Sequence, residues 1–144
     1  MRRIKVLPFA ILVILTACNE PKTTTRYVQP ANGYAQMVVI ESGREKTLQI
    51  SGQVGAGSDL ESQMRDILLK LRILLESEGG DYEDIVKINT YIVDYQPEDL
   101  DIFRGVRKEI FSDKITPAST LVGVTSLALP EWLIEIDAIA VISK

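Results

Sequence analysis

The sequence predicts an α+β fold, in which two helices cover one face of a mixed β-sheet. Residues 134–141 carry apolar side chains at every second position, which is typical of a half-buried strand. Residues 60–75 and 100–110 carry apolar side chains at helical spacing, so each segment forms a helix with one buried face. The predicted order is ββαβαββ without internal repeats, which implies helices layered on one sheet.

The first two predicted strands form a hairpin. Residues 34–40 and 46–51 flank a short polar turn that contains Gly43. The glycines that follow, Gly52, Gly55 and Gly57, fit neither nucleotide-binding fingerprint. We interpret this stretch as a flexible loop between a strand and a helix.

Two helices follow, each with start signals. Ser58 and Glu61 have the spacing of a capping box, and Gly79 with Gly80 ends the first helix. Proline and acidic residues at positions 97–99 open the second helix. The apolar positions predict core-facing stripes, which comprise Leu60, Met64, Ile67, Leu68, Leu71 and Leu75 in the first helix and Leu100, Phe103, Val106 and Ile110 in the second.

The remaining strands are predicted at residues 85–93, 118–124 and 134–141. In the first of these, Val86, Ile88, Thr90 and Ile92 are expected to share a face. In the last, Glu135 and Asp137 would lie on one face, where two nearby carboxylates repel and one holds its proton more tightly. On residue counts alone, a solvated strand face is favoured over a catalytic site as the interpretation of this pair.

The N-terminal residues resemble a bacterial lipoprotein signal. Arg2, Arg3 and Lys5 precede a short apolar run that is too short to span a bilayer. Residues 15–18 read Leu-Thr-Ala-Cys, which is similar to a lipobox, and Cys18 is the only cysteine. We therefore expect residues 1–17 to be a lipoprotein signal peptide and Cys18 to carry the lipid. An ordinary signal peptide is the alternative.

The region after Cys18 is polar, and we expect residues 18–29 to be the lipidated cysteine and a tether, followed by one domain at residues 30–144. An edge strand that starts near Arg26 is the alternative. The expected location is the bacterial cell envelope, and Asn19 is compatible with the periplasmic face of the outer membrane.

Charge and composition restrict the possible functions. Cleavage before Cys18 removes three basic residues, which leaves 13 basic against 20 acidic residues and a net charge of −7. This balance argues against nucleic acid as a partner. The chain has no histidine, so Ser-His-Asp catalysis and histidine metal sites are excluded. No cofactor or metal is implied.

Four motifs in order resemble the reactive intermediate deaminase family (Rid, also called YjgF or L-PSP). The C-terminal signature combines Pro117-Ala118-Ser119-Thr120 with the strand IEIDAIAV at residues 134–141. The other matching stretches are residues 33–36, 50–54 and 84–87. The resemblance implies a chorismate-mutase-like fold and a homotrimer around a central β-barrel, with small-molecule clefts between subunits. Val38, Ile40, Leu121 and Leu133 would supply an apolar second sheet face for this self-association.

The resemblance also implies site residues. Glu135 matches the catalytic glutamate that places water for hydrolysis of an enamine or imine, and Tyr34, Ser51 and Gly52 match residues that line the cleft.

Three positions depart from the family pattern. Ser119 stands where active members have an arginine that holds the substrate carboxylate, which a serine cannot replace. Leu121 replaces a frequent cysteine, and Arg104 stands in place of a cleft asparagine. The chain therefore resembles an arginine-lacking branch.

The expected function is a lipid-anchored Rid-type protein. Its ligand would lack a clear carboxylate clamp, with weak deaminase-like hydrolysis and little acceleration of 2-imino acid hydrolysis. The alternative is a non-catalytic binding or assembly module of the envelope. A ribonuclease is disfavoured by the acidic balance and the absence of histidine.

Overall fold

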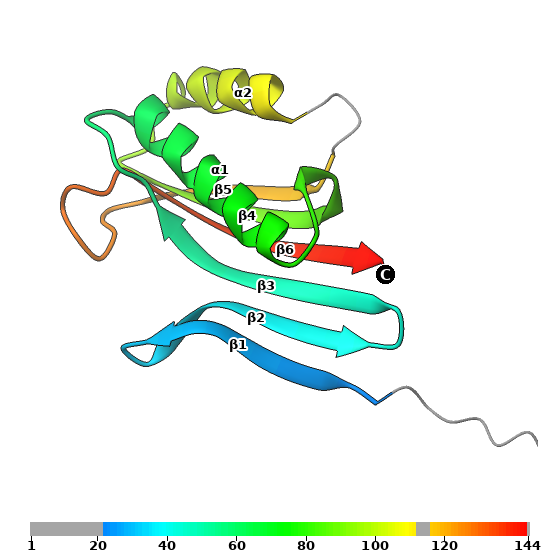
Figure 1. Ribbon diagram of the computed structural model, residues 1–144. Helices are drawn as coiled ribbons and strands as arrows, with labels where there is room; N and C mark the ends of the chain where they lie inside the picture. The colour runs from blue at the N-terminus through cyan, green and yellow to red at the C-terminus, as the bar shows by residue number, and fades with distance from the viewer. Residues whose placement is uncertain (1–21, 112–115, 144) are drawn as a thin grey trace, which may run out of the picture.

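A computed structural model describes residues 22–111 and 116–143 of the chain (Figure 1). Two α-helices lie on one face of a six-stranded sheet, and a short 3₁₀-helix precedes the fourth strand. The elements are β1 (Thr24–Ala31), β2 (Tyr34–Ser42), β3 (Glu45–Val54), α1 (Leu60–Ser77), η1 (Tyr82–Asp84), β4 (Ile85–Val93), α2 (Asp99–Ile110), β5 (Ala118–Val124) and β6 (Ile134–Ser143). The predicted α+β class and the two helices on one face of a mixed sheet are confirmed.

The sheet has the strand order β1-β2-β3-β6-β4-β5. All neighbouring strands are antiparallel except β4 and β5, which run parallel. A parallel pair needs a crossover connection, and α2 supplies it. The C-terminal strand β6 lies in the middle of the sheet, between β3 and β4, which explains why its alternation is so clear in the sequence.

The core lies between the sheet and the helices. On β6, Ile134, Ile136, Ala138 and Ala140 are buried, as their period-two spacing predicts. The apolar stripe of α1 packs against this face, and α2 contributes fewer buried side chains. The free energy of burial amounts to roughly 1.5–3 kcal/mol for each large side chain.

The other sheet face is not covered by any described element. Val38 and Ile40 lie on it and are half-buried, as expected for a partly apolar second face. Leu121 does not lie on this face, because it is paired with buried Thr90 of β4 and packs against the core. Its assignment to the second face is therefore wrong.

The N-terminal boundary also differs from the expected tether. Residues from Thr24 to Ala31 form β1, which pairs with β2 along its length, so the alternative of an edge strand is observed. Arg26 fixes this strand to the end of α1 through an ion pair with Glu78, at 2.7 Å. Residues 1–21, which include the predicted signal peptide and Cys18, lie outside the described residues.

Two local details are corrected. The capping box of α1 is formed by Asp59 and Ser62, one residue later than predicted, with Ser62 N donating to Asp59 Oδ1 at 2.8 Å. At the start of β4 the register shifts, so that Ile85 is buried and Val86 is exposed. Within residues 22–111 and 116–143, no helix is long and apolar enough to cross a membrane.

Candidate functional site

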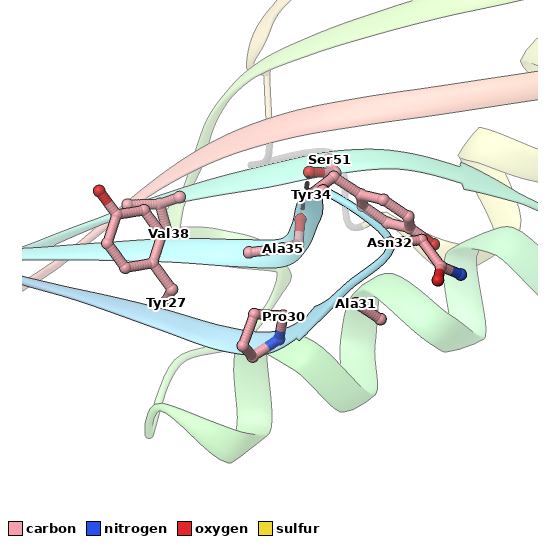
Figure 2. A pocket seen from close by; sticks show the side chains of 9 residues that line it. Tyr27, Pro30, Ala31, Asn32, Tyr34, Ala35, Val38 and Ser51 are labelled. Atoms are coloured by element: carbon pink, nitrogen blue, oxygen red, sulfur yellow. Dashed lines mark hydrogen bonds between the residues drawn. The ribbon is translucent and has the colours of Figure 1, made fainter.

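Four of the predicted site residues meet where β2, β3 and β6 lie side by side. Tyr34, Ser51, Gly52 and Glu135 line one pocket of about 670 Å³, and we call them the first half-site. Gln36, Gln53, Lys70 and Trp132 are among the other residues that line it. A second pocket, of about 500 Å³, lies beside the β1–β2 hairpin and shares Tyr34 and Ser51 with the first (Figure 2). The strand pairing therefore assembles half of the predicted site within one chain.

Gly52 makes room for the carboxylate of Glu135. A Cβ atom added at position 52 would collide with Glu135 Oε1 and with the two carbons behind it. The position lies at the irregularity between β3 and β6, where the register shifts between Ile50 and Gln53. The Ser-Gly pair thus has a steric role, since only glycine lets the carboxylate rest on the backbone of β3.

Glu135 has an altered acidity for identifiable reasons. Burial raises the pKa of its carboxyl group, and the charge of Asp137 adds to the rise. Asp137 accepts hydrogen bonds from Asn89 Nδ2 at 2.9 Å and from Tyr91 Oη at 3.2 Å. The charge of Asp137 in turn raises the pKa of Tyr91. Glu135 therefore takes up a proton more readily than an exposed glutamate does, which suits a group that exchanges protons with water.

Hydrogen bonds fix the part of the pocket wall that Ser51 and Gln53 form. Ser51 Oγ donates to the carbonyl oxygen of Ala35 at 2.6 Å, a bond drawn in Figure 2. The buried side chain of Gln53 donates to the carbonyl oxygen of Ser51 at 2.8 Å and to Gln36 Oε1 at 3.1 Å. Because its hydrogen is committed to Ala35, the Ser51 hydroxyl can offer a ligand only its lone pairs.

Gln63, which is not among the residues predicted from the sequence, holds the loop before β6. Its side-chain amide on α1 donates to the carbonyl oxygens of Gly57 at 3.1 Å and Glu131 at 2.8 Å, and its Oε1 accepts from Leu133 N at 2.8 Å. The loop carries Trp132 into the pocket. Gln63 stands on the buried side of the helix, so a polar residue inside the apolar stripe was the available signal.

The remaining predicted residues lie on β5 and α2. Ser119 is exposed on β5, and Arg107 from α2 donates to its Oγ at 3.2 Å. We call Arg107 and Ser119 the second half-site. Leu121 is partly buried against the core, and Arg104 is exposed on α2. Arg104 is the arginine predicted from the sequence, but Arg107 is the α2 arginine that reaches Ser119.

One chain does not bring the two half-sites together. β4 separates β6 from β5 in the sheet. Ser119 pairs with Ile88 on the helix-covered face, whereas Glu135 alternates with buried Ile134 and Ile136 and so points to the other face. A cleft that uses both half-sites needs a second chain. Among the described residues, no group of three or more acidic or cysteine side chains is placed to hold a metal ion.

Comparisons with known proteins agree on one family. The sequence profile described as Endoribonuclease L-PSP matches residues 17–142. Among solved structures, a Rid-family protein from Yersinia pestis is 32% identical and has a TM-score of 0.62, with 81% of this chain and 97% of that chain covered. A member of the YjgF/YER057c/UK114 family from Mycobacterium tuberculosis is 27% identical and has a TM-score of 0.69, with 84% of this chain and 100% of that chain covered.

A YjgF-family protein from Neisseria meningitidis is 25% identical and has a TM-score of 0.73, with 84% of this chain and 97% of that chain covered. These similarities extend over nearly the whole of each relative. The chain therefore belongs to the Endoribonuclease L-PSP family, whose solved members also carry the names YjgF and Rid.

Proposed function

We propose that this protein is a Rid-type small-molecule protein with its cleft between subunits and a weak capacity to hydrolyse C=N compounds. The observation that carries the proposal is the position of Glu135. Its carboxyl group rests on Gly52 in a pocket with Tyr34 and Ser51, and burial raises its pKa. A protonatable group fixed in a pocket is what water activation requires.

A homotrimer would complete the cleft. The family resemblance implies this assembly, and two features of the chain support it. The uncovered sheet face carries half-buried Val38, Ile40 and Ile139, which a neighbouring subunit can cover. The two half-sites lie on different strands and on different faces of the sheet. An interface between two subunits would bring one half-site of each subunit together in one cleft.

The proposed reaction needs only water and the side chains of the first half-site. Ionised Glu135 accepts a proton from a water molecule whose oxygen attacks the carbon of a protonated C=N group, which gives a neutral carbinolamine. Glu135 passes this proton to the carbinolamine nitrogen, the C–N bond breaks, and the departing ammonia takes up the hydroxyl proton, so that ammonium and a C=O group remain. Glu135 can return the proton, because its raised pKa keeps the protonated form accessible.

Hydrolysis should depend on pH through Glu135. The carboxylate form is the base, so activity is present above the pKa of Glu135 and is lost as the pH falls through it. Because burial raises that pKa, the loss begins at a higher pH than for an exposed glutamate. We expect imines generated in situ to be hydrolysed slowly by the wild type with this profile, and Glu135→Gln to reduce the rate to that of buffer. Equal rates for both proteins would contradict the proposed chemistry.

A non-catalytic binding module is the second candidate. The serine at position 119, where active members have an arginine, favours it. If the wild type accelerates no imine at any pH and still binds a small molecule in the cleft, this candidate replaces the hydrolase.

We also propose that the mature protein is anchored to the cell envelope by lipid on Cys18. β1 begins six residues after Cys18, at Thr24, so the anchor would hold the β1 edge within about 20 Å of the membrane. Several acyl chains, at about 0.8 kcal/mol for each buried methylene group, give durable attachment.

The anchor predicts a change of fractionation. Wild-type protein should require detergent for extraction, whereas Cys18→Ser should accumulate as an uncleaved or soluble protein. Mass spectrometry of the N-terminal peptide should show the added lipid. An unmodified Cys18 together with identical fractionation of both proteins would remove this part of the proposal.

A further inference from the structure

Arg107 differs from the other arginines whose pKa is displaced. Arg26, Arg65 and Arg72 each contact at least one glutamate at 2.7–2.8 Å, and these carboxylates raise their pKa values. Among the described residues, no carboxylate lies within 4.0 Å of Arg107, and burial alone lowers its pKa. Arg107 is therefore a partly buried cation without an anionic partner in the described part of the chain.

Aromatic rings hold the guanidinium group in place. Its central carbon lies 5.5 Å from the ring centroids of both Phe103 and Phe111. Such contacts fix the plane of an arginine side chain and reduce the entropy that ligand binding would cost. The orientation carries the Nη1 group to Ser119 Oγ, at 3.2 Å.

The second half-site is accessible and has unused donors. β5 is an edge strand of the sheet, and Ser119 on it is exposed. A guanidinium group has five N–H donors, and the contact with Ser119 uses one of those of Arg107. The Ser119 hydroxyl, which accepts from Arg107, keeps its own hydrogen free to donate.

We propose that Arg107 and Ser119 form a carboxylate-binding site, in which a guanidinium group supplied by α2 replaces the arginine that is missing from β5. Two parallel N–H groups of one guanidinium match the two oxygens of a carboxylate, and the Ser119 hydroxyl can add a third hydrogen bond. The inference rests on the proposed intersubunit cleft and gives its ligand a chemical class, namely a small monocarboxylate. It differs from the expectation, made from the sequence, of a ligand without a carboxylate.

The surroundings favour a single negative charge over a phosphate. Helix α2 carries three acidic residues, Asp99, Asp101 and Glu109, and three basic residues, Arg104, Arg107 and Lys108, so it adds no net positive charge that would favour a dianion over a monoanion. Arg107 is one cation, and one cation balances one carboxylate. The pocket of the first half-site contains Lys70, but this side chain is already bonded to Asp66 at 2.9 Å and to the carbonyl oxygen of Val54 at 2.8 Å.

Binding of pyruvate and of its neutral isostere pyruvamide tests the inference. With the detergent-solubilised full chain followed by calorimetry or NMR titration, we expect pyruvate to bind about tenfold or more tightly than pyruvamide. Arg107→Ala should weaken pyruvate binding by about 10- to 100-fold and leave pyruvamide binding unchanged. Arg107→Lys, which keeps the charge but not the fork, should lose affinity by an intermediate factor.

The matched control is Lys108→Ala, which removes an exposed cation from the next position of the same helix. It should leave the affinity for pyruvate unchanged. Equal affinities of pyruvate and pyruvamide, or an unaltered pyruvate affinity in a folded Arg107→Ala protein, would overturn the inference. Arg107 would then only fasten β5 to α2.

Failure of the carboxylate site and failure of the proposed hydrolase give different results. Arg107-dependent pyruvate binding with no hydrolysis of any imine supports the carboxylate site and contradicts the hydrolase. Hydrolysis that requires Glu135 but is insensitive to Arg107→Ala contradicts the carboxylate site and supports the hydrolase.

Discussion

Gln63→Leu is expected to lower the free energy of unfolding by about 3 kcal/mol, because it leaves backbone groups that Gln63 bonds without hydrogen-bond partners. Leucine keeps the volume of the side chain but removes both donors and the acceptor. The amide of Leu133 and the carbonyl oxygen of Glu131 would lose their hydrogen-bond partner. Gln63 is only 2% exposed, so water cannot easily replace its side chain as that partner. The loop that carries Trp132 would loosen, so ligand binding should weaken as well.

Urea denaturation measures this loss, and thermal unfolding should show a decrease in Tm of about 10 °C. Gln96→Leu is the matched control, because Gln96 is exposed and its side chain makes one local bond, to the carbonyl oxygen of Asp94. It should change stability by less than about 0.5 kcal/mol. Equal stabilities of the two variants would show that the Gln63 bonds do not hold the loop.

Moving the guanidinium from α2 to β5 is expected to produce the largest change in activity. In Ser119→Arg combined with Arg107→Ser, the arginine stands at the β5 position where the family resemblance implies one. We expect hydrolysis of 2-iminopropionate to increase by about 100-fold or more, because correct positioning of the reacting group can supply about 7–11 kcal/mol. In the wild type, a carboxylate bound at Arg107 as proposed would lie closer to α2, which would place the C=N carbon poorly for Glu135.

Two further variants test this explanation. Ser119→Arg alone should gain less activity than the double variant, since two guanidinium groups would then compete for the same space. Adding Glu135→Gln to the double variant should remove the gain. A folded double variant that remains inactive would show that the cleft has diverged beyond its carboxylate clamp, and Leu121 would be the next residue to examine.

Periodic patterns made most of the fold predictable. β6 lies between two strands and has one face on the core, so buried and half-buried residues alternate along it. The apolar residues at every second position of the sequence follow this pattern. β1 was assigned to a tether because it is an edge strand with no fully buried residue, and its residues satisfy their backbone by pairing with β2. Polar edge strands of this kind leave no apolar alternation to detect.

The site was predictable where it depends on neighbouring strands. Once β2, β3 and β6 are paired, Tyr34, Ser51 and Glu135 must be close, and motif similarity identifies them. Arg107 was not predicted because the family similarity identifies only residues at the positions of the family motif. The guanidinium group of Arg107 comes from α2, whereas the motif position, Ser119, lies on β5. Phe103 and Phe111, each four residues away from Arg107, were the signal that could have revealed it.

The proposed intersubunit cleft can be tested directly by cross-linking. The central claim is that the two half-sites of neighbouring subunits face each other in a trimer. A chain that begins at Asn19 contains no cysteine, so Tyr34→Cys and Ser119→Cys can be introduced as its only thiols. Both positions are exposed and therefore reactive in one chain.

Treatment of the double variant with a short bis-maleimide, followed by denaturing electrophoresis, is the measurement that tests this claim most directly. We predict covalent trimers from the double variant, covalent dimers from an equal mixture of the two single variants, and monomers from either single variant alone. Light scattering before treatment should give the mass of three subunits. Monomers in every lane, from a protein that also scatters light as a monomer, would contradict the intersubunit cleft.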